Sequence, residues 1–211
     1  MKFGVVQFPG SCDERDALHA ASRVGDAELL WHADPDLKGV DAIIVPGGFS
    51  YGDYLRAGAI ARFSPVMAAV EQFAREGGLV LGICNGFQVL CEAGLLPGAL
   101  LPNTGLRFTC RQVDIEVVNA STPWTRACEP GQILSIPAKH MSGRYWAPDD
   151  LPADQVVLRY APGHNFNGST RDIAGVCNAG GNVMGLMPHP EHAVDALTGS
   201  VDGLALIGGP V

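Results

Sequence analysis

The sequence predicts an α/β domain, a three-layer sandwich with a mostly parallel central sheet and added antiparallel strands in the C-terminal half. In the first half, short aliphatic runs alternate with amphipathic helical patterns, which is typical of a parallel sheet covered on both faces. In the second half, strand-like runs follow one another with few helices between them. The length of 211 residues suits one domain, and we expect residues 1–211 to form it.

The first half should contribute four strands and three helices. We expect the strands at Phe3–Phe8, Glu28–Trp31, Ala42–Val45 and Leu79–Ile83. We expect the helices at Asp13–Arg23, Ser64–Glu76 and Gly86–Ala93. The middle helix has the clearest boundaries, because Ser64 suits the N-cap, Pro65 suits the first helical position and Gly77-Gly78 ends the helix.

The second half should add antiparallel strands to the edge of the parallel sheet. We expect strands at Val113–Val118, Gln132–Ile136, Val156–Tyr160, Ile173–Asn178 and Asn182–Met187. Ala179-Gly180-Gly181 joins the last two runs and is typical of a tight hairpin. A short helix at Asp202–Ile207 should follow them.

Composition excludes several classes of protein. Hydrophobic residues make up 47% of the chain and charged residues 17%, which excludes intrinsic disorder. Fourteen Lys and Arg against 22 Asp and Glu give a net charge of −8, which disfavours nucleic-acid binding. No apolar run is long enough to span a membrane, and the N-terminal apolar stretch is too short for a signal peptide. We therefore expect a cytoplasmic protein that binds neither nucleic acid nor membrane.

The six cysteines are scattered, with no C-x-x-C pair. In a chain of this size and expected compartment, that pattern favours free thiols over disulfides or zinc ligands. We expect no metal site.

Cys84 has the strongest signal for chemistry. The apolar strand before it ends in Gly82-Ile83-Cys84-Asn85-Gly86, and a helix follows. A nucleophile on a strand-to-helix turn has a strained backbone that projects its side chain above the sheet, and flanking glycines avoid collisions there. The helix N-terminus also favours the thiolate form. A buried structural cysteine in a tight turn is the alternative, and the paired glycines favour the nucleophile.

A base for this thiol is expected in Met187-Pro188-His189-Pro190-Glu191. The prolines should keep the chain extended, so that His189 and Glu191 share one face. That arrangement suits an imidazole oriented by a carboxylate in a Cys-His-acid triad. An ordinary polar turn is the alternative. His192 makes a metal-binding pair with His189 conceivable, but no third ligand is near in sequence.

An oxyanion hole is expected where another strand ends in Pro46-Gly47-Gly48. Glycine there lets bare N–H groups approach a substrate oxygen, and the N–H of Asn85 could supply the second donor. An ordinary turn is again the alternative. A phosphate loop is disfavoured because the Lys-Ser/Thr pair of the Walker pattern is missing.

Taken in order, these motifs resemble the triad-type (class I) glutamine amidotransferases. The long run from Gly47 to Ala61, together with Ile83–Leu90, Asn167-Gly168-Ser169, Asp172–Gly175 and Met187–Glu191, resembles one member family. That family is the glutaminase subunits of phosphoribosylformylglycinamidine synthase, the PurQ family. The resemblance covers essentially the whole chain and implies the flavodoxin-like fold of class I glutamine amidotransferases.

The resemblance implies a glutaminase reaction. Cys84 would attack the side-chain amide of L-glutamine, His189 would transfer the protons and Glu191 would orient His189. The N–H groups of Gly48 and Asn85 would hold the oxyanion.

The resemblance also implies substrate contacts and partners. Gly47, Phe49 and Gln88 would contact the substrate. Ammonia would pass to a synthetase subunit, PurL, which uses ATP and Mg to convert formylglycinamide ribonucleotide to formylglycinamidine ribonucleotide. A small subunit, PurS, would accompany it. This chain would bind no cofactor itself and would be a monomer when isolated.

Some segments depart from the family pattern. His140-Met141-Ser142-Gly143 stands where His-Gly-Glu-Gly is usual, and the segment around Gly163-His164 replaces a shorter form. We interpret His140 and His164 as loop residues, with a partner-facing rim and a plain surface role equally open.

Two other functions stay open at this point. A DJ-1-like thiol sensor also places a cysteine on an elbow, but it needs an acidic neighbour for the thiol and no late Pro-His-Pro-Glu segment. A stand-alone γ-glutamyl or peptide hydrolase on the same scaffold would turn over at full rate without partners.

Overall fold

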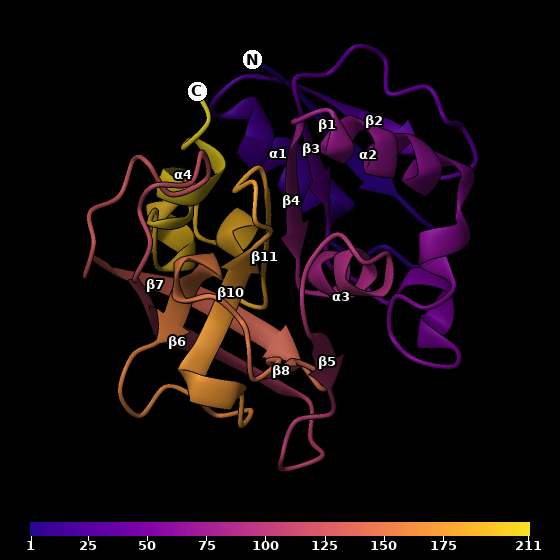
Figure 1. Cartoon of the computed structure of the whole chain (residues 1–211). Coiled ribbons are helices and arrows are strands. Elements are labelled where there is room, and N and C mark those ends of the chain that lie inside the picture. Colours follow the sequence, from indigo (N-terminus) through magenta and orange to yellow (C-terminus); the bar gives the residue numbers. More distant parts are fainter.

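The computed structural model describes all 211 residues and has a nine-stranded sheet at its centre (Figure 1). The strand order is β2-β1-β3-β4-β11-β10-β9-β6-β7. The strands of the parallel part are β1 (Lys2–Gln7), β2 (Asp26–Trp31), β3 (Ala42–Val45), β4 (Leu79–Ile83) and β11 (Val183–Leu186). The antiparallel part contains β6 (Thr109–Val117), β7 (Ile133–His140), β9 (Val156–Tyr160) and β10 (Ile173–Cys177).

Helices cover both faces of the parallel strands. The helices are α1 (Glu14–Ser22), α2 (Pro65–Arg75), α3 (Asn85–Glu92) and α4 (Gly203–Ile207). Helices α1 and α4 contact each other on one side, and α2 and α3 lie on the other (Figure 1). The three-layer α/β class predicted from the alternation of strands and helices is confirmed. No helix is long and apolar enough to cross a membrane.

The predicted elements are present, with small shifts at their ends. The Ala179-Gly180-Gly181 hairpin is confirmed, since β10 and β11 pair antiparallel on either side of it. Ser64 is the N-cap residue of α2, but its hydroxyl bonds the Tyr51 hydroxyl at 2.8 Å and leaves the helix backbone uncapped. A small second sheet of β5 (Ala99–Leu101) and β8 (Arg144–Trp146) was not expected.

One contact in the sheet register matters most for function. Strand β11 inserts beside β4 in parallel, and Ile83 pairs with Leu186. The backbone N–H of Cys84 then donates to the Leu186 carbonyl at 2.8 Å. Because parallel strands end at the same edge of a sheet, residues that follow β4 and β11 meet there although a hundred positions separate them.

Candidate active site

Four loops meet at the carboxyl ends of β1, β3, β4 and β11. Val45, the last residue of β3, pairs with Gly82, and Ile83 pairs with Leu186. The segments after these strands carry the expected oxyanion glycines, Cys84 and His189. The register therefore brings the predicted motifs to one edge of the sheet.

Cys84 has the strained backbone expected of a nucleophile elbow. Its φ of 50° and ψ of −104° lie in a region that non-glycine residues rarely occupy. A Cβ on Gly82 would lie 2.9 Å from the backbone of Gly86, and a Cβ on Gly86 would overlap the carbonyl oxygen of Val45. Glycine at both positions lets α3 start directly against β3 and β4, which holds the thiol at the sheet edge.

His189 and Glu191 are in hydrogen-bond contact, although the extended segment expected around them is wrong. Residues Pro190–His192 form a single 3-10 turn. Proline is compatible with this turn because it occupies the first helical position, where its missing N–H is not needed. The turn brings Glu191 back under the ring, so that Nδ1 of His189 donates to Oε1 of Glu191 at 2.6 Å.

The imidazole of His189 is buried and electrostatically stabilised as a cation. Burial by itself would lower the pKa of His189, but the charge of Glu191, the nearby Cys84 sulfur and the hydrogen bond to Glu191 raise it well above its usual range. Nε2 of His189 is buried and has no hydrogen-bond partner. The nitrogen opposite Glu191 is therefore available for proton exchange with the sulfur.

Cys84 and His189 open into a cavity of about 550 Å³. Gly48, Phe49 and Gln88 also line it, whereas Gly47 does not. The other residues of its wall are Cys12, Asp13, Gly52, Asp53, Leu55, Arg56, Ala57, Leu100, Pro102, Phe108, Lys139, His140, Met141 and Ser142. A cavity of this size is ample for an amino acid.

Gly48 and Asn85 are the residues whose N–H groups we expect to form the oxyanion hole. Gly48 has a φ of 144°, which favours glycine, and its N–H makes no backbone hydrogen bond. Asn85 is the first residue of α3, so no preceding helical turn supplies an acceptor for its N–H. The buried Asn85 side chain accepts from the Ser50 N–H at 3.0 Å and donates to Gln88 Oε1 at 2.8 Å.

Gln88 spans the site from α3 to the loop after β7. Its Nε2 donates to the Ser142 carbonyl at 2.6 Å, while its Oε1 accepts from Asn85. The Gln88 side chain thereby connects the His140-Met141-Ser142 segment, which differs from the family pattern, to the helix that starts at the elbow. Gly47 lies behind the wall, where a Cβ would meet Asp13 Oδ2 and His189 Cε1.

The surroundings of the thiol disfavour a sensor. The one hydrogen-bond acceptor for Sγ is the Lys139 carbonyl, at 3.9 Å. No carboxylate bonds the sulfur, and an acidic neighbour is what a DJ-1-like sensor would need. All six cysteines are free thiols, as the scattered pattern predicted.

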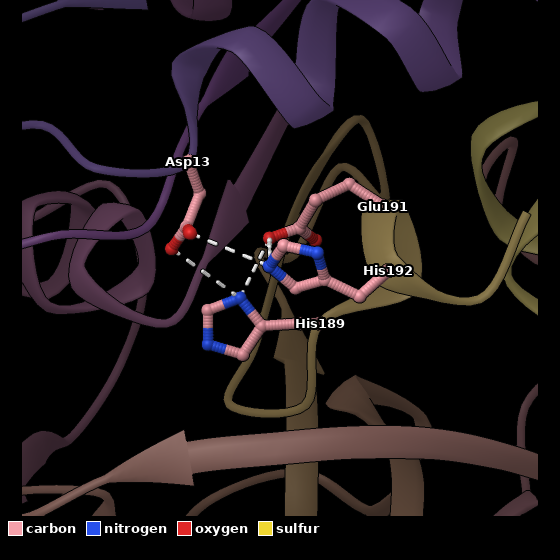
Figure 2. Close-up of side chains that lie close together, drawn as sticks. All are labelled: Asp13, His189, Glu191 and His192. Atoms are coloured by element: carbon pink, nitrogen blue, oxygen red, sulfur yellow. Dashed lines mark hydrogen bonds and ion pairs between the residues drawn. The ribbon is translucent and has the colours of Figure 1, made fainter. Parts of the chain in front are cut away.

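Asp13 is a charged residue of the site that sequence reasoning missed. We expected it to begin the first helix, but it precedes α1, and its side chain does not cap that helix. The carboxylate points into the site beside His189 and His192 (Figure 2). The signal available in the sequence was its place just after β1, at the carboxyl edge of the sheet.

The interpretation of His140 as a loop residue is wrong. His140 ends β7 and is 3% exposed, and its ring stacks on Phe166 with centroids 5.1 Å apart. Burial, with a smaller contribution from the nearby His189, lowers its pKa to about 3, so the ring is neutral. His164 has a structural role, since its Nδ1 accepts from the Asp114 N–H at 2.8 Å.

Four potential metal ligands cluster in the site. One ligand atom from each of Asp13, His189, Glu191 and His192 lies within 4.8 Å of the others. The Lys139 ammonium already forms an ion pair with Asp13 at 2.5 Å, and His189 already bonds Glu191. These contacts favour a proton-handling network over a metal site.

Comparison with known proteins decides the family. The model of the CobB/CobQ-like glutamine amidotransferase domain matches residues 1–203. The PurQ subunit of phosphoribosylformylglycinamidine synthase from Rubrobacter xylanophilus is 62% identical over 98% of this chain and 96% of that protein. The chain belongs to the PurQ family. The PurQ of Mycobacterium tuberculosis is 61% identical over 97% of this chain and 94% of its own length.

One solved structure agrees with this membership of the PurQ family, and a second shares the fold. A chain of the PurLQS structure from Thermotoga maritima matches with a TM-score of 0.93 and 46% identity, over 99% of this chain and 96% of that one. The glutaminase domain of Trypanosoma brucei CTPS, solved with acivicin, matches with a TM-score of 0.62 over 100% of this chain and 93% of its own. At 15% identity, that second likeness shows the fold alone.

Proposed function

We propose that this chain is the glutaminase subunit of a phosphoribosylformylglycinamidine synthase, that it acts as one amidotransferase domain over residues 1–211, and that Cys84, His189 and Glu191 are its catalytic residues. The observation that carries the residue assignment is the register of β4 beside β11. It brings a strained thiol and a buried His–Glu pair to one sheet edge, where Cys84 and His189 line one cavity. Membership of the PurQ family supports the substrate and the assembly.

The first half of the proposed reaction makes a thioester and releases ammonia. The Sγ proton of Cys84 moves to Nε2 of His189, and the sulfur attacks the side-chain amide carbon of L-glutamine. The N–H groups of Gly48 and Asn85 stabilise the oxyanion that forms. The tetrahedral intermediate collapses, the C–N bond breaks and Nε2 gives its proton to the departing ammonia.

The second half regenerates the thiol. Nε2 of His189 takes a proton from water, which attacks the γ-glutamyl thioester carbonyl. The C–S bond then breaks, glutamate leaves and the proton returns to Cys84. Throughout the cycle, Glu191 holds Nδ1 of His189 as the protonated nitrogen, so that Nε2 stays the exchanging one.

Ammonia is the product that the assembly uses. We propose that it passes to the synthetase subunit PurL, which converts formylglycinamide ribonucleotide to formylglycinamidine ribonucleotide with ATP and Mg, and that PurS completes the complex. Nucleotide and Mg are bound by the partner in this scheme. Isolated, the chain is a monomer.

Exposed apolar side chains at the cavity mouth support a covered state. Phe49, Leu55, Phe108 and Met141 line the cavity and are each about half exposed or more. Apolar groups gathered around a site are typical of a surface that another protein covers. We propose that the synthetase docks over this mouth, which would let it control access to Cys84.

The test compares glutamine hydrolysis by the chain alone and in the reconstituted complex with ATP and formylglycinamide ribonucleotide. We expect low activity alone and a large increase in the complex, because a partner can switch the site on only by binding its competent form better. Cys84→Ala should abolish hydrolysis in both.

Three results would contradict the proposal. They are full activity of the free chain, no activity in any complex, or a Cys84→Ala variant as active as wild type. The first would favour the stand-alone hydrolase. Stable sulfinic acid on Cys84 after mild peroxide, without hydrolysis, would favour the sensor.

A further inference from the structure

We propose that Asp13 is a positioning residue for the glutaminase reaction, a second carboxylate that stabilises the imidazolium form of His189. The inference rests on the proposed function and deepens it. It extends the catalytic machinery to the loop between β1 and α1, a loop that contains none of the Cys-His-Glu triad residues.

Asp13 reaches the ring from the β1–α1 loop, and its carboxylate faces the same ring nitrogen as that of Glu191 (Figure 2). Its Oδ2 lies 3.6 Å from Nδ1 of His189, the nitrogen that donates to Glu191. That distance is too long for a second hydrogen bond but short enough for strong charge interaction in a buried site. Asp13 therefore acts on His189 through its charge.

The carboxylate of Asp13 is fixed and ionised. Its side chain is 4% exposed, its Oδ1 receives the Lys139 ammonium at 2.5 Å, and Nε2 of His192 lies 3.3 Å from the same oxygen. Burial by itself would raise the pKa of Asp13, but the contact with His192, the charge of His189 and the ion pair with Lys139 lower it. The chain also leaves room for it, because a Cβ on Gly47 would overlap Oδ2.

Charge balance within the buried cluster gives Asp13 its effect. The groups that face His189 are Asp13 from the β1–α1 loop, Cys84 from the elbow, Lys139 and His140 from β7, and Glu191 and His192 from its own turn. The two carboxylates and the one ammonium leave an excess of one negative charge. A proton on His189 neutralises that excess.

Removing the charge of Asp13 takes away one of the two carboxylates that face Nδ1 of His189. Glu191 would then be the one anionic oxygen group beside the ring, and its charge is already shared with the Lys139 ammonium. The imidazolium that forms when Cys84 gives up its proton would lose stability. The thiolate–imidazolium pair should therefore become less populated in Asp13→Asn, a substitution that keeps the shape of the side chain.

Alkylation of Cys84 measures that population without using glutamine. The full-length chain is treated with iodoacetamide between about pH 6 and pH 10, and peptide mass spectrometry that separates Cys84 from Cys91 gives the rate. Asp13→Asn should lower the rate about tenfold near pH 6.5 and leave it unchanged near pH 10, since a one-unit shift of the imidazolium is a tenfold change. Asp16→Asn, an exposed aspartate on α1, is the matched control and should behave as wild type.

A second readout connects this to turnover in the reconstituted complex. Asp13→Asn should lower kcat about tenfold near neutral pH with KM within about twofold, because in this proposal the carboxylate acts on the proton carrier. Asp13→Glu keeps the charge and should recover most of the low-pH alkylation. A purely structural residue would not produce a loss that disappears at high pH.

The Lys139→Met background covers a folding failure of the single variant. Removing one partner of a buried ion pair is more damaging than removing both. Asp13→Asn in that background, compared with Lys139→Met alone, isolates the effect of Asp13 and should show the same loss near neutral pH. A rate within twofold of its reference near pH 6.5 in both backgrounds would overturn the inference. If the variants still hydrolyse glutamine in that case, the proposed function is unaffected. If the wild-type complex does not hydrolyse glutamine, the proposed function alone is contradicted.

Discussion

Replacing Glu191 with glutamine tests the role of the buried carboxylate in proton transfer. The substitution keeps the size of the side chain and removes its charge. The side chains of His189 and Glu191 are 1% and 0% exposed, and their nitrogen and oxygen are 2.6 Å apart. Solvent therefore screens little of the interaction.

The size of the effect follows from that geometry. Losing an opposite charge at hydrogen-bond distance lowers the pKa of a buried cation by about 1–3 units, which is about 10- to 1,000-fold in the population of the imidazolium. The amide can also donate to Nδ1 and fix the wrong tautomer, and in the Ser-His-Asp triad of serine proteases the corresponding change lowers kcat by about 10⁴-fold. We expect Glu191→Gln to lower kcat/KM by about 10²- to 10⁴-fold.

The assay is glutamine hydrolysis in the reconstituted complex, measured across pH. Glu129→Gln makes the same change in charge at an exposed position and is the matched control. Circular dichroism and thermal unfolding should show both variants folded. Activity of Glu191→Gln within threefold of wild type at every pH would refute the reasoning, because it would mean that the carboxylate does not support the base.

Three further predictions concern the surroundings of the triad. Gly47→Ala should reduce glutaminase activity by at least about tenfold, because its Cβ would lie 2.8 Å from His189 Cε1. Gly105→Ala is the control and should keep wild-type activity, because its Cβ would meet nothing within 4 Å. His140→Gln should reduce the dependence of the free energy of unfolding on pH in acid. The pKa of His140 is about 3 in the folded chain, so between about pH 6.5 and pH 3 the unfolded chain binds a proton at this residue and the folded chain does not. Wild type should therefore lose up to about 1.4 kcal/mol of stability per pH unit in urea unfolding. An equal slope in the variant would contradict this. Leu55→Glu should weaken binding of the synthetase about tenfold in titration calorimetry and leave the melting temperature unchanged, since Leu55 is 89% exposed at the cavity mouth; unchanged affinity would place the docking surface elsewhere.

Local pattern was enough to predict most of the fold. The strands Ala42–Val45, Leu79–Ile83 and Val156–Tyr160 have the predicted boundaries, because continuous apolar runs between turn residues leave little ambiguity. Strands β5 and β8 were missed because each has three residues, too few for an alternating pattern. Their pairing depends on contacts between distant segments.

In the site too, local motifs could be predicted from the sequence, and contacts between distant segments could not. The elbow at Cys84 and the Pro-His-Pro-Glu segment are local motifs, and the sequence was sufficient to find them. Asp13 and His140 acquire their environments from other parts of the chain: Asp13 through Lys139 on β7, and His140 through Phe166 and Asn103. The sequence within a few residues of Asp13 or His140 does not predict that either side chain is buried.

The most direct test of the central claim is to trap the acyl-enzyme. The complex is mixed with L-glutamine, quenched in acid within one turnover and digested for peptide mass spectrometry. We predict a γ-glutamyl group on the sulfur of Cys84 that disappears as ammonia and glutamate accumulate. Ammonia release with no adduct on Cys84, or with the adduct on Cys12 of the same cavity wall, would contradict the account.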